Sequence, residues 1–264
     1  MPYFSYAQIH LGPITLYTWG LFIGLAFLAG YGYFFKEAKK QGMEENKILG
    51  LALTLFFGAI IGSRLGYVAQ FPARYFSSPG AIFEFTAGGL TFYGGLLGAV
   101  IFGWLYLRRS KPQRGKPQGG KPQGGKLDLL KTADLLAPAA AIGIFIGRIG
   151  CFLINDHQGA PANLPWAIRW LDGISRHPVA LYLSLNGLML FLILLFLKSR
   201  LKRPGHLAFI FLTYYAASRF LLDFTRASGT ALSDPHYLNL TFSQWASLAI
   251  LIAILFHLKK RRQV

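Results

Sequence analysis

The chain has 264 residues, of which 53% are hydrophobic, 16% aromatic and only 14% charged. A soluble domain carries about 25% charged residues, so this composition excludes an ordinary water-facing surface. It also excludes a disordered chain, because disordered chains are poor in apolar residues. The one cysteine, Cys151, allows no intramolecular disulfide and no metal site built from cysteine pairs. What remains is a membrane protein that crosses the bilayer several times.

Seven apolar stretches are long enough to cross a bilayer as helices, for which about 20 residues are needed. We expect these spans at Ile14–Phe35, Ile48–Phe71, Gly88–Leu107, Ala133–Ile154, Pro178–Leu197, His206–Phe224 and Phe242–Leu258. The predicted fold class is therefore an all-α membrane protein with seven transmembrane helices. Residues 1–264 then form a single polytopic membrane domain.

The distribution of basic residues predicts the orientation of these spans. Twenty of the 27 Lys and Arg residues fall in four clusters beside apolar stretches, at Lys36–Lys47, Arg108–Lys131, Lys198–Arg203 and Lys259–Arg262. With the N-terminus outside, all four clusters and the C-terminus are cytoplasmic, in agreement with the positive-inside rule. The net charge of +17 therefore indicates orientation in a membrane and no nucleic-acid partner. No Lys or Arg precedes the first span, so we expect that helix to be retained and not cleaved as a signal peptide.

A repeat occupies the predicted cytoplasmic loop after the third span. Residues 111–126 read KPQRGKPQGGKPQGGK, which has no apolar face and is rich in Pro and Gly. This composition predicts a flexible, solvated linker. Contact of its basic residues with anionic lipids is the alternative.

Three arginines, Arg64, Arg148 and Arg219, lie inside predicted spans. An arginine at the centre of a membrane helix costs at least about 2.5–3.5 kcal/mol. Measured from the cytoplasmic ends, all three reach about 20–24 Å in a hydrocarbon core about 30 Å thick. Guanidinium groups bind phosphate through paired hydrogen bonds, so we predict a cavity for an anionic lipid headgroup, open toward the outer leaflet. The alternative is that each arginine extends to the interface or pairs structurally.

Further polar residues are predicted at the same outer level. Asp223 and Arg226 follow Arg219 on one helix face, so Asp223 either aims Arg219 through an ion pair or takes part in proton transfer. Tyr93 lies between two glycine pairs, which permit close approach of a ligand or another helix. A place in an aromatic belt at the interface explains Tyr93 equally well.

Cys151, Asp156 and His157 lie near the end of the fourth span. One histidine beside one carboxylate provides too few ligands for a metal site, so neither a metal nor another cofactor is expected. Cys151 is expected to be an inert buried thiol, because no base stands at helical spacing from it.

The run GRIGCFLINDHQG at 147–159 resembles the signature of the prolipoprotein diacylglyceryl transferases, the bacterial membrane enzymes of the first step of lipoprotein maturation. Five shorter blocks also resemble parts of that family and occur in the same order along the chain. They are LGPITLYTWGL, GSRLGYV, GGLTFYGGLLG, RHPVALY and YAASRFLLDFTR. Each block is weak alone, and together on seven predicted spans they are specific. The likeness runs from about Leu11 to Arg226.

The resemblance implies a reaction and its partners. The diacylglyceryl group of phosphatidylglycerol is transferred to the thiol of the lipobox cysteine in a prolipoprotein signal peptide, which forms a thioether and releases glycerol phosphate. The partners are then phosphatidylglycerol, these signal peptides and the surrounding membrane lipids. The implied location is the bacterial inner membrane, with the active site toward the outer leaflet.

The resemblance also assigns residues. Arg148 matches the signature arginine, expected to bind the lipid phosphate, and Arg219 matches a second essential arginine. Asp223 stands where many members have Glu, and Tyr215 matches a tyrosine one turn before the second arginine. The predicted catalytic residues are Arg148, Arg219, Tyr93 and Asp223. The predicted substrate-binding residues are Arg148, Arg64, Tyr215, Asp156 and His157.

The chain departs from the family pattern at several positions. Tyr93 replaces a histidine, and Cys151 and Ile154 replace asparagines. An arginine is replaced by Ala160, and the Gln and Glu of the RHPxQLYE block by Ala180 and Leu183. The general base therefore stays open among Tyr93, Asp223, Asp156 and His157. We rank electrostatic stabilisation of the substrate thiolate above any single base.

Two other functions stay open. The departures leave room for an inactive relative that binds lipid or signal peptide without chemistry. Intramembrane charges also mark the pathways of transporters, including lipid transporters. A transporter predicts inverted repeats, and none is evident in the sequence.

Overall fold

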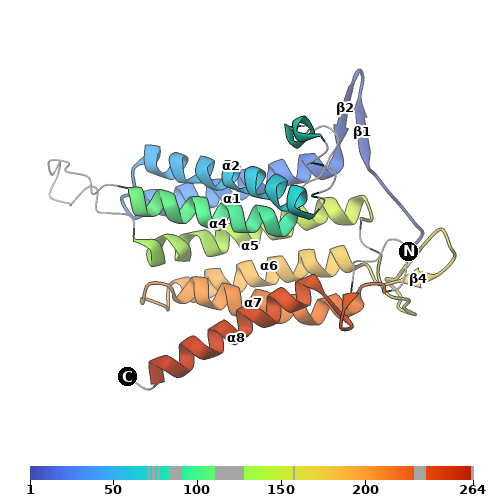
Figure 1. Cartoon of the computed structure of the whole chain (residues 1–264). Coiled ribbons are helices and arrows are strands. Elements are labelled where there is room, and N and C mark those ends of the chain that lie inside the picture. Colours follow the sequence, from blue (N-terminus) through green and yellow to red (C-terminus); the bar gives the residue numbers. More distant parts are fainter. Residues whose placement is uncertain are drawn as a thin grey trace. The chain divides into compact units, whose positions relative to one another are not determined.

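The computed structural model describes residues 1–70, 72, 75, 78–83, 91–110, 128–156, 158–228 and 236–262 (Figure 1). In these residues the α-helices are α1 (Thr18–Lys40), α2 (Glu45–Gln70), α4 (Phe92–Arg109), α5 (Leu129–Leu153), α6 (Val179–Lys198), α7 (His206–Leu222) and α8 (Phe242–Arg262). Short 3-10 helices are η1 (Pro79–Phe83) and η3 (Asp223–Thr225). Three antiparallel strand pairs join β1 (Gln8–Leu11) to β2 (Ile14–Tyr17), β3 (Ile168–Arg169) to β4 (Ser175–Arg176), and β5 (His236–Tyr237) to β6 (Leu240–Thr241).

Each predicted span overlaps one of these helices, and the strands are short elements between them. Among the described residues, five helices are long and apolar enough to cross a membrane, namely α1, α2, α5, α6 and α7 continued by η3. The predicted helical fold class is thereby confirmed, and these long apolar helices are consistent with a multi-pass membrane protein. The helices α4 and α8 coincide with the third and seventh predicted spans, and the number of seven crossings stays a prediction. The 111–126 linker lies outside the described residues.

The first predicted span was wrong at its start. Residues 14–17 form strand β2, which pairs with β1 in a register that joins Gln8 to Tyr17 and Leu11 to Ile14. Gly12 has a φ of 61° and takes the first central position of the two-residue loop, where hairpins favour glycine. Hydropathy extended the span because the strand is apolar and only four residues long, too short to show a clear alternation.

The contacts of the described residues define two compact units, which are Met1–Tyr33 with Ala133–Val264, and Phe34–Thr132. In the second unit, glycines set the approach of α2 to α4. A Cβ atom added to Gly62 would overlap the Gly94 carbonyl oxygen, and one added to Gly98 would overlap the Gly58 carbonyl oxygen. Small residues allow such close packing of membrane helices. Gly94, in the glycine pair that follows Tyr93, therefore serves a helix contact, one of the two uses predicted for these glycines.

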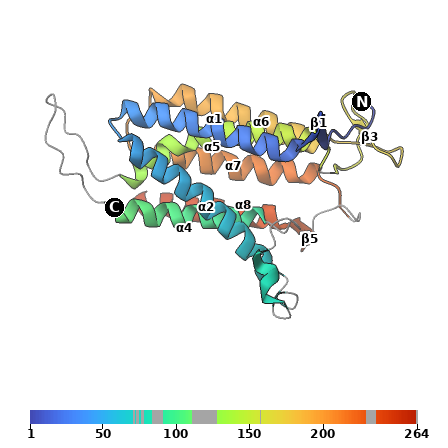
Figure 2. The same cartoon turned by 90° about the horizontal axis from the view of Figure 1, so that it is seen from above.

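In the first unit, α5, α6 and α7 run side by side (Figures 1 and 2). They enclose an apolar core formed by Ala137, Ala141, Leu190, Leu194 and Leu207. The Ser184 hydroxyl of α6 donates a hydrogen bond to the Phe145 carbonyl of α5 at 3.0 Å. This packing joins α5, α6 and α7 within the first unit.

The other end of α7 is held by a carboxylate of α5. Asp134 accepts hydrogen bonds from the backbone N–H groups of Gly205 and Ala208, at 2.6 and 2.9 Å. The first N–H groups of a helix have no partners within the helix. Asp134 therefore supplies the acceptors that let α7 begin at His206.

The glycine contact between α2 and α4 yields a stability prediction. We expect Gly62→Ala to lower the free energy of unfolding by about 1–3 kcal/mol, because the added methyl group forces the two helices apart. The matched control is Gly24→Ala in α1, where an added Cβ meets nothing within 4 Å. Thermal unfolding of the purified proteins in detergent measures the difference. Equal melting temperatures for the two variants would show that the close approach is not required.

Candidate active site

A fully buried carboxylate, that of Asp223, lies directly after α7. Its side chain has no exposed surface, and Oδ1 lies 3.1 Å from Nη2 of Arg219 and 3.5 Å from Nε of Arg226. The two arginine side chains are less than a tenth exposed. A buried charge is strongly destabilising unless it is paired, so the carboxylate and the two guanidinium groups depend on one another.

The backbone at this point differs from the predicted helix face. Helix α7 ends at Leu222, Asp223 begins η3, and Arg226 is extended with a φ of −81° and a ψ of 151°. The expectation that Arg219, Asp223 and Arg226 share one helix face was therefore wrong for Arg226. Its side chain still reaches Asp223, because the tight 3-10 turn brings the chain back toward the carboxylate.

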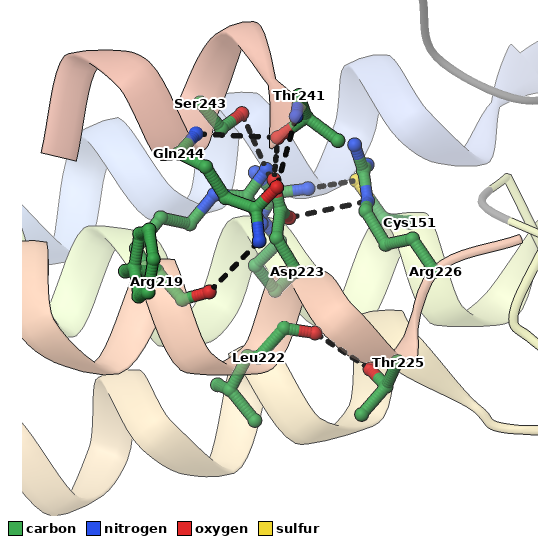
Figure 3. A network of polar contacts seen from close by, with 11 residues as sticks. Cys151, Arg219, Leu222, Asp223, Thr225, Arg226, Thr241, Ser243 and Gln244 are labelled. Atoms are coloured by element: carbon green, nitrogen blue, oxygen red, sulfur yellow. Dashed lines mark hydrogen bonds and ion pairs between the residues drawn. The ribbon is translucent and has the colours of Figure 1, made fainter. Parts of the chain in front are cut away.

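Two hydroxyl groups from α8 and the strand before it complete this arrangement (Figure 3). The Thr241 hydroxyl donates a hydrogen bond to Oδ2 of Asp223. The Ser243 hydroxyl accepts one from Nη2 of Arg219 at 3.0 Å. Sequence reasoning missed both residues. The signal that could have drawn attention to them is the TFSQ run, a capping-box pattern directly before the last apolar stretch.

Arg148 approaches from the last third of α5. Its Nη1 lies 4.0 Å from the sulfur of Cys151, one turn along the helix. Asp156, just beyond the end of α5, interacts electrostatically with both Arg148 and Arg226. Asp156 thus connects the arginine of α5 with the corner after α7. Burial raises the pKa of the Asp156 carboxyl, while these two guanidinium groups act in the opposite direction.

Backbone pairing holds Asp156 beside that corner. Residues 158–160 run antiparallel to 225–227, with hydrogen bonds from Ala160 N–H to the Thr225 carbonyl at 2.8 Å and from Ala227 N–H to the Gln158 carbonyl at 3.0 Å. The pairing places the chain after Asp156 next to Arg226. We call the five side chains of Arg148, Arg219, Arg226, Asp156 and Asp223 the arginine–carboxylate cluster. It has three guanidinium groups against two carboxyl groups, so it carries a surplus of positive charge.

The predicted site residues are distributed as follows. Arg148, Arg219, Asp223 and Asp156 belong to the cluster in the first unit. Tyr215 lies one turn before Arg219 with its ring stacked on Phe211 at 5.9 Å, against the apolar core. Tyr93 lies in the first turn of α4, and its side chain is outside the described part of the structure, as is the whole of His157. Cys151 is buried, as expected.

Arg64 belongs to the second unit. Its guanidinium group donates hydrogen bonds to the Ala81 and Ile82 carbonyls, at 2.6 and 2.7 Å. It also lies over the rings of Tyr67 and Tyr75, 6.0 and 5.5 Å from their centroids. These contacts tie the end of α2 to η1. Substrate binding by Arg64 stays a prediction. The contacts of its guanidinium group are those expected under the alternative, in which Arg64 has a structural role.

The fold and the cluster together define a multi-pass helical membrane protein with a cationic site around the buried carboxylate of Asp223. The model of the family described as prolipoprotein diacylglyceryl transferase matches residues 7–259, and the chain belongs to this family. A phosphatidylglycerol–prolipoprotein diacylglyceryl transferase of Finegoldia magna is 33% identical over 254 residues, which cover 95% of this chain and 94% of the relative. The enzyme of that name from Nitratidesulfovibrio vulgaris is 32% identical over 224 residues, covering 83% and 79% of the two chains. One from Bordetella bronchiseptica is 29% identical over 260 residues, covering 96% and 93%.

The raised pKa of Asp156 predicts how stability depends on pH. A carboxyl group whose pKa rises on folding stabilises the protein at low pH, and this contribution is lost as the pH rises through the raised pKa. Asp156→Asn removes the titration and keeps the shape of the side chain. We expect the melting temperature of the wild type, relative to Asp156→Asn, to fall as the pH rises from about 4, the ordinary pKa of an aspartate side chain, through the raised pKa. A relative melting temperature that rises over this range would show that Arg148 and Arg226 outweigh burial.

Proposed function

We propose that this chain transfers the diacylglyceryl group of phosphatidylglycerol to the lipobox cysteine of prolipoproteins. A bond forms between the cysteine sulfur and C3 of the glyceryl group, and the bond from C3 to the phosphate oxygen breaks. The cysteine thiol gives up its proton, and glycerol phosphate leaves. Membership of the family supports this reaction, and the single observation that carries it in this chain is the surplus of positive charge in the arginine–carboxylate cluster, whose Asp223, Arg219 and Arg226 side chains are buried.

The cluster fits the charge that develops in the reaction. The departing phosphate gains negative charge in the transition state, and fixed cationic donors in a poorly hydrated site stabilise such charge strongly. We assign Arg148 to the lipid phosphate and Arg219 to the same group from the opposite helix. Arg226 adds positive charge and, with Arg219, compensates Asp223.

The contacts of the two carboxyl groups favour different roles for them. Both oxygens of Asp223 are engaged, Oδ2 by Thr241 and Oδ1 by two arginines. This supports the orienting role of Asp223 over proton transfer. Burial raises the pKa of the Asp156 carboxyl above its ordinary value, which favours proton uptake by this group. The same cationic surroundings lower the pKa of a substrate thiol. We therefore rank electrostatic stabilisation of the substrate thiolate above proton removal by a single base.

The proposal includes an orientation in the bacterial inner membrane. We place the N-terminus outside, the C-terminus in the cytoplasm and the arginine–carboxylate cluster toward the outer leaflet, with α4 and α8 as the third and seventh crossings. The four basic clusters support this arrangement. Reporter fusions after Arg109, Lys202 and Lys260 are expected to report the cytoplasm, and a fusion within 161–176 the outside. A cytoplasmic report from 161–176 would contradict the seven-span topology.

Arg148 provides the main test of the function. We expect Arg148→Ala to lower the rate of transfer roughly 10²–10³-fold, which corresponds to about 2.7–4 kcal/mol. Arg148→Lys is expected to recover little of it, because lysine lacks the planar pair of donors. The purified protein is incubated with phosphatidylglycerol and a lipobox peptide, and the mass of the peptide is measured over time.

Two other arginines serve as comparisons in the same assay. Arg169→Ala removes an exposed guanidinium group from the same unit and is expected to keep the wild-type rate. Arg64→Ala is expected to lose less than Arg148→Ala, since backbone carbonyls already occupy its donors. A peptide whose mass stays unchanged with the wild type would favour the inactive relative or the lipid transporter. A folded Arg148→Ala protein with near wild-type activity would mean that Arg148 is not the phosphate ligand.

A further inference from the structure

The strand and first turn that begin α8 carry a rigid cap. The backbone N–H of Gln244 donates to the Thr241 hydroxyl oxygen at 3.2 Å, and Oε1 of Gln244 accepts from the Thr241 N–H at 2.9 Å. These reciprocal bonds form a capping box, which satisfies two backbone donors at the start of the helix. Both side chains are at least 98% buried. The position of the Thr241 hydroxyl is therefore closely fixed.

The same hydroxyl determines how Asp223 is turned. A threonine hydroxyl has one proton to donate, and Thr241 donates it to Oδ2 of Asp223 while its oxygen accepts from Gln244. With Oδ2 held in this way, Oδ1 faces Arg219 and Arg226. Thr241 thus fixes the rotation of the carboxylate whose other oxygen meets the two guanidinium groups (Figure 3).

The orientation of the Asp223 carboxylate determines how the guanidinium group of Arg219 is held. Its Nη2 is held from two sides, by Asp223 at 3.1 Å and by the Ser243 hydroxyl at 3.0 Å. Its Nη1 is buried and has no hydrogen-bond partner among the described protein groups. Leaving a buried donor of a charged group unpaired is costly. Nη1 is therefore the donor that an anionic ligand would complete.

We infer that Thr241 and Ser243 are positioning residues, which hold Nη2 of Arg219 so that Nη1 is presented to the phosphate of the lipid. This inference rests on the proposed function for its ligand. Ser243 acts directly on the guanidinium group, and Thr241 acts through Asp223. The start of α8 then belongs to the machinery of transfer, although neither residue contacts the reacting atoms.

The test compares Thr241→Val, which keeps the shape and loses the hydroxyl, with Thr241→Ser, which keeps the hydroxyl. We expect Thr241→Val to lower kcat for transfer roughly tenfold, with a change in KM for phosphatidylglycerol below about threefold. Thr241→Ser is expected to restore kcat. A loss of stability alone would lower the melting temperature and the fraction of folded enzyme. Rates are therefore expressed per folded molecule, so that a change in kcat reports on the site itself.

A double variant tests whether Thr241 acts through Asp223. In the Asp223→Asn background, Thr241→Val is expected to lower kcat by less than about twofold further, because residues that act as a chain are not additive. An additional tenfold loss would overturn the indirect role of Thr241.

Ser243→Ala provides a second, independent variant, and Ser247→Ala is its matched control. Ser247 is a buried hydroxyl one turn further along α8, and its removal is expected to leave kcat unchanged. Equal kcat values for Ser243→Ala and Ser247→Ala would overturn the role of Ser243, and this comparison remains informative if Thr241→Val does not fold. A wild-type protein that modifies no peptide would instead overturn the proposed function, so the two failures are distinguishable.

Discussion

The structure of the site depends on the burial of one carboxylate. Asp223 has no exposed surface and contacts two guanidinium groups and a hydroxyl. Breaking a buried ion pair by removing one partner costs about 3–5 kcal/mol, because it leaves an uncompensated charge. The end of α7, the extended segment at Arg226 and the start of α8 must therefore assemble together. Each of them supplies a partner that the others need, which joins three separate stretches of the chain into one electrostatic arrangement.

The sequence predicts the parts of this arrangement that are local. Arg219 and Asp223 are four residues apart, so helical geometry alone brings them together, and the cost of a guanidinium group in a membrane marks Arg148 as well. Spacing could not reveal that α7 ends at Leu222, because residues 220–226 contain neither glycine nor proline to mark a stop. It also could not reveal Thr241 and Ser243, since 18 and 24 residues separate them from their partners. Contacts over such distances follow from how the helices pack, which periodicity does not specify.

The same contrast explains the remaining differences. Apolar residues of a short strand and of a membrane helix have the same hydropathy, so strand β2 was merged into the first predicted span. Arg64 has the sequence setting of Arg148 and Arg219, yet its donors meet backbone carbonyls of η1. A guanidinium group inside an apolar span thus indicates a polar partner reliably, whereas the sequence leaves open whether that partner is a ligand or the protein's own backbone.

The cap that Asp134 provides for α7 bears on how the protein fits its bilayer. Helix α7 continued by η3 spans His206–Thr225, 20 residues, which is about 30 Å at 1.5 Å per residue and matches a hydrocarbon core about 30 Å thick. The ends of such a helix normally lie where water can satisfy their free backbone groups. Because Asp134 of α5 satisfies the backbone donors at the start of α7, that end has no need to reach water. The start of α7 is thereby anchored to α5, so its level in the membrane is tied to that of α5.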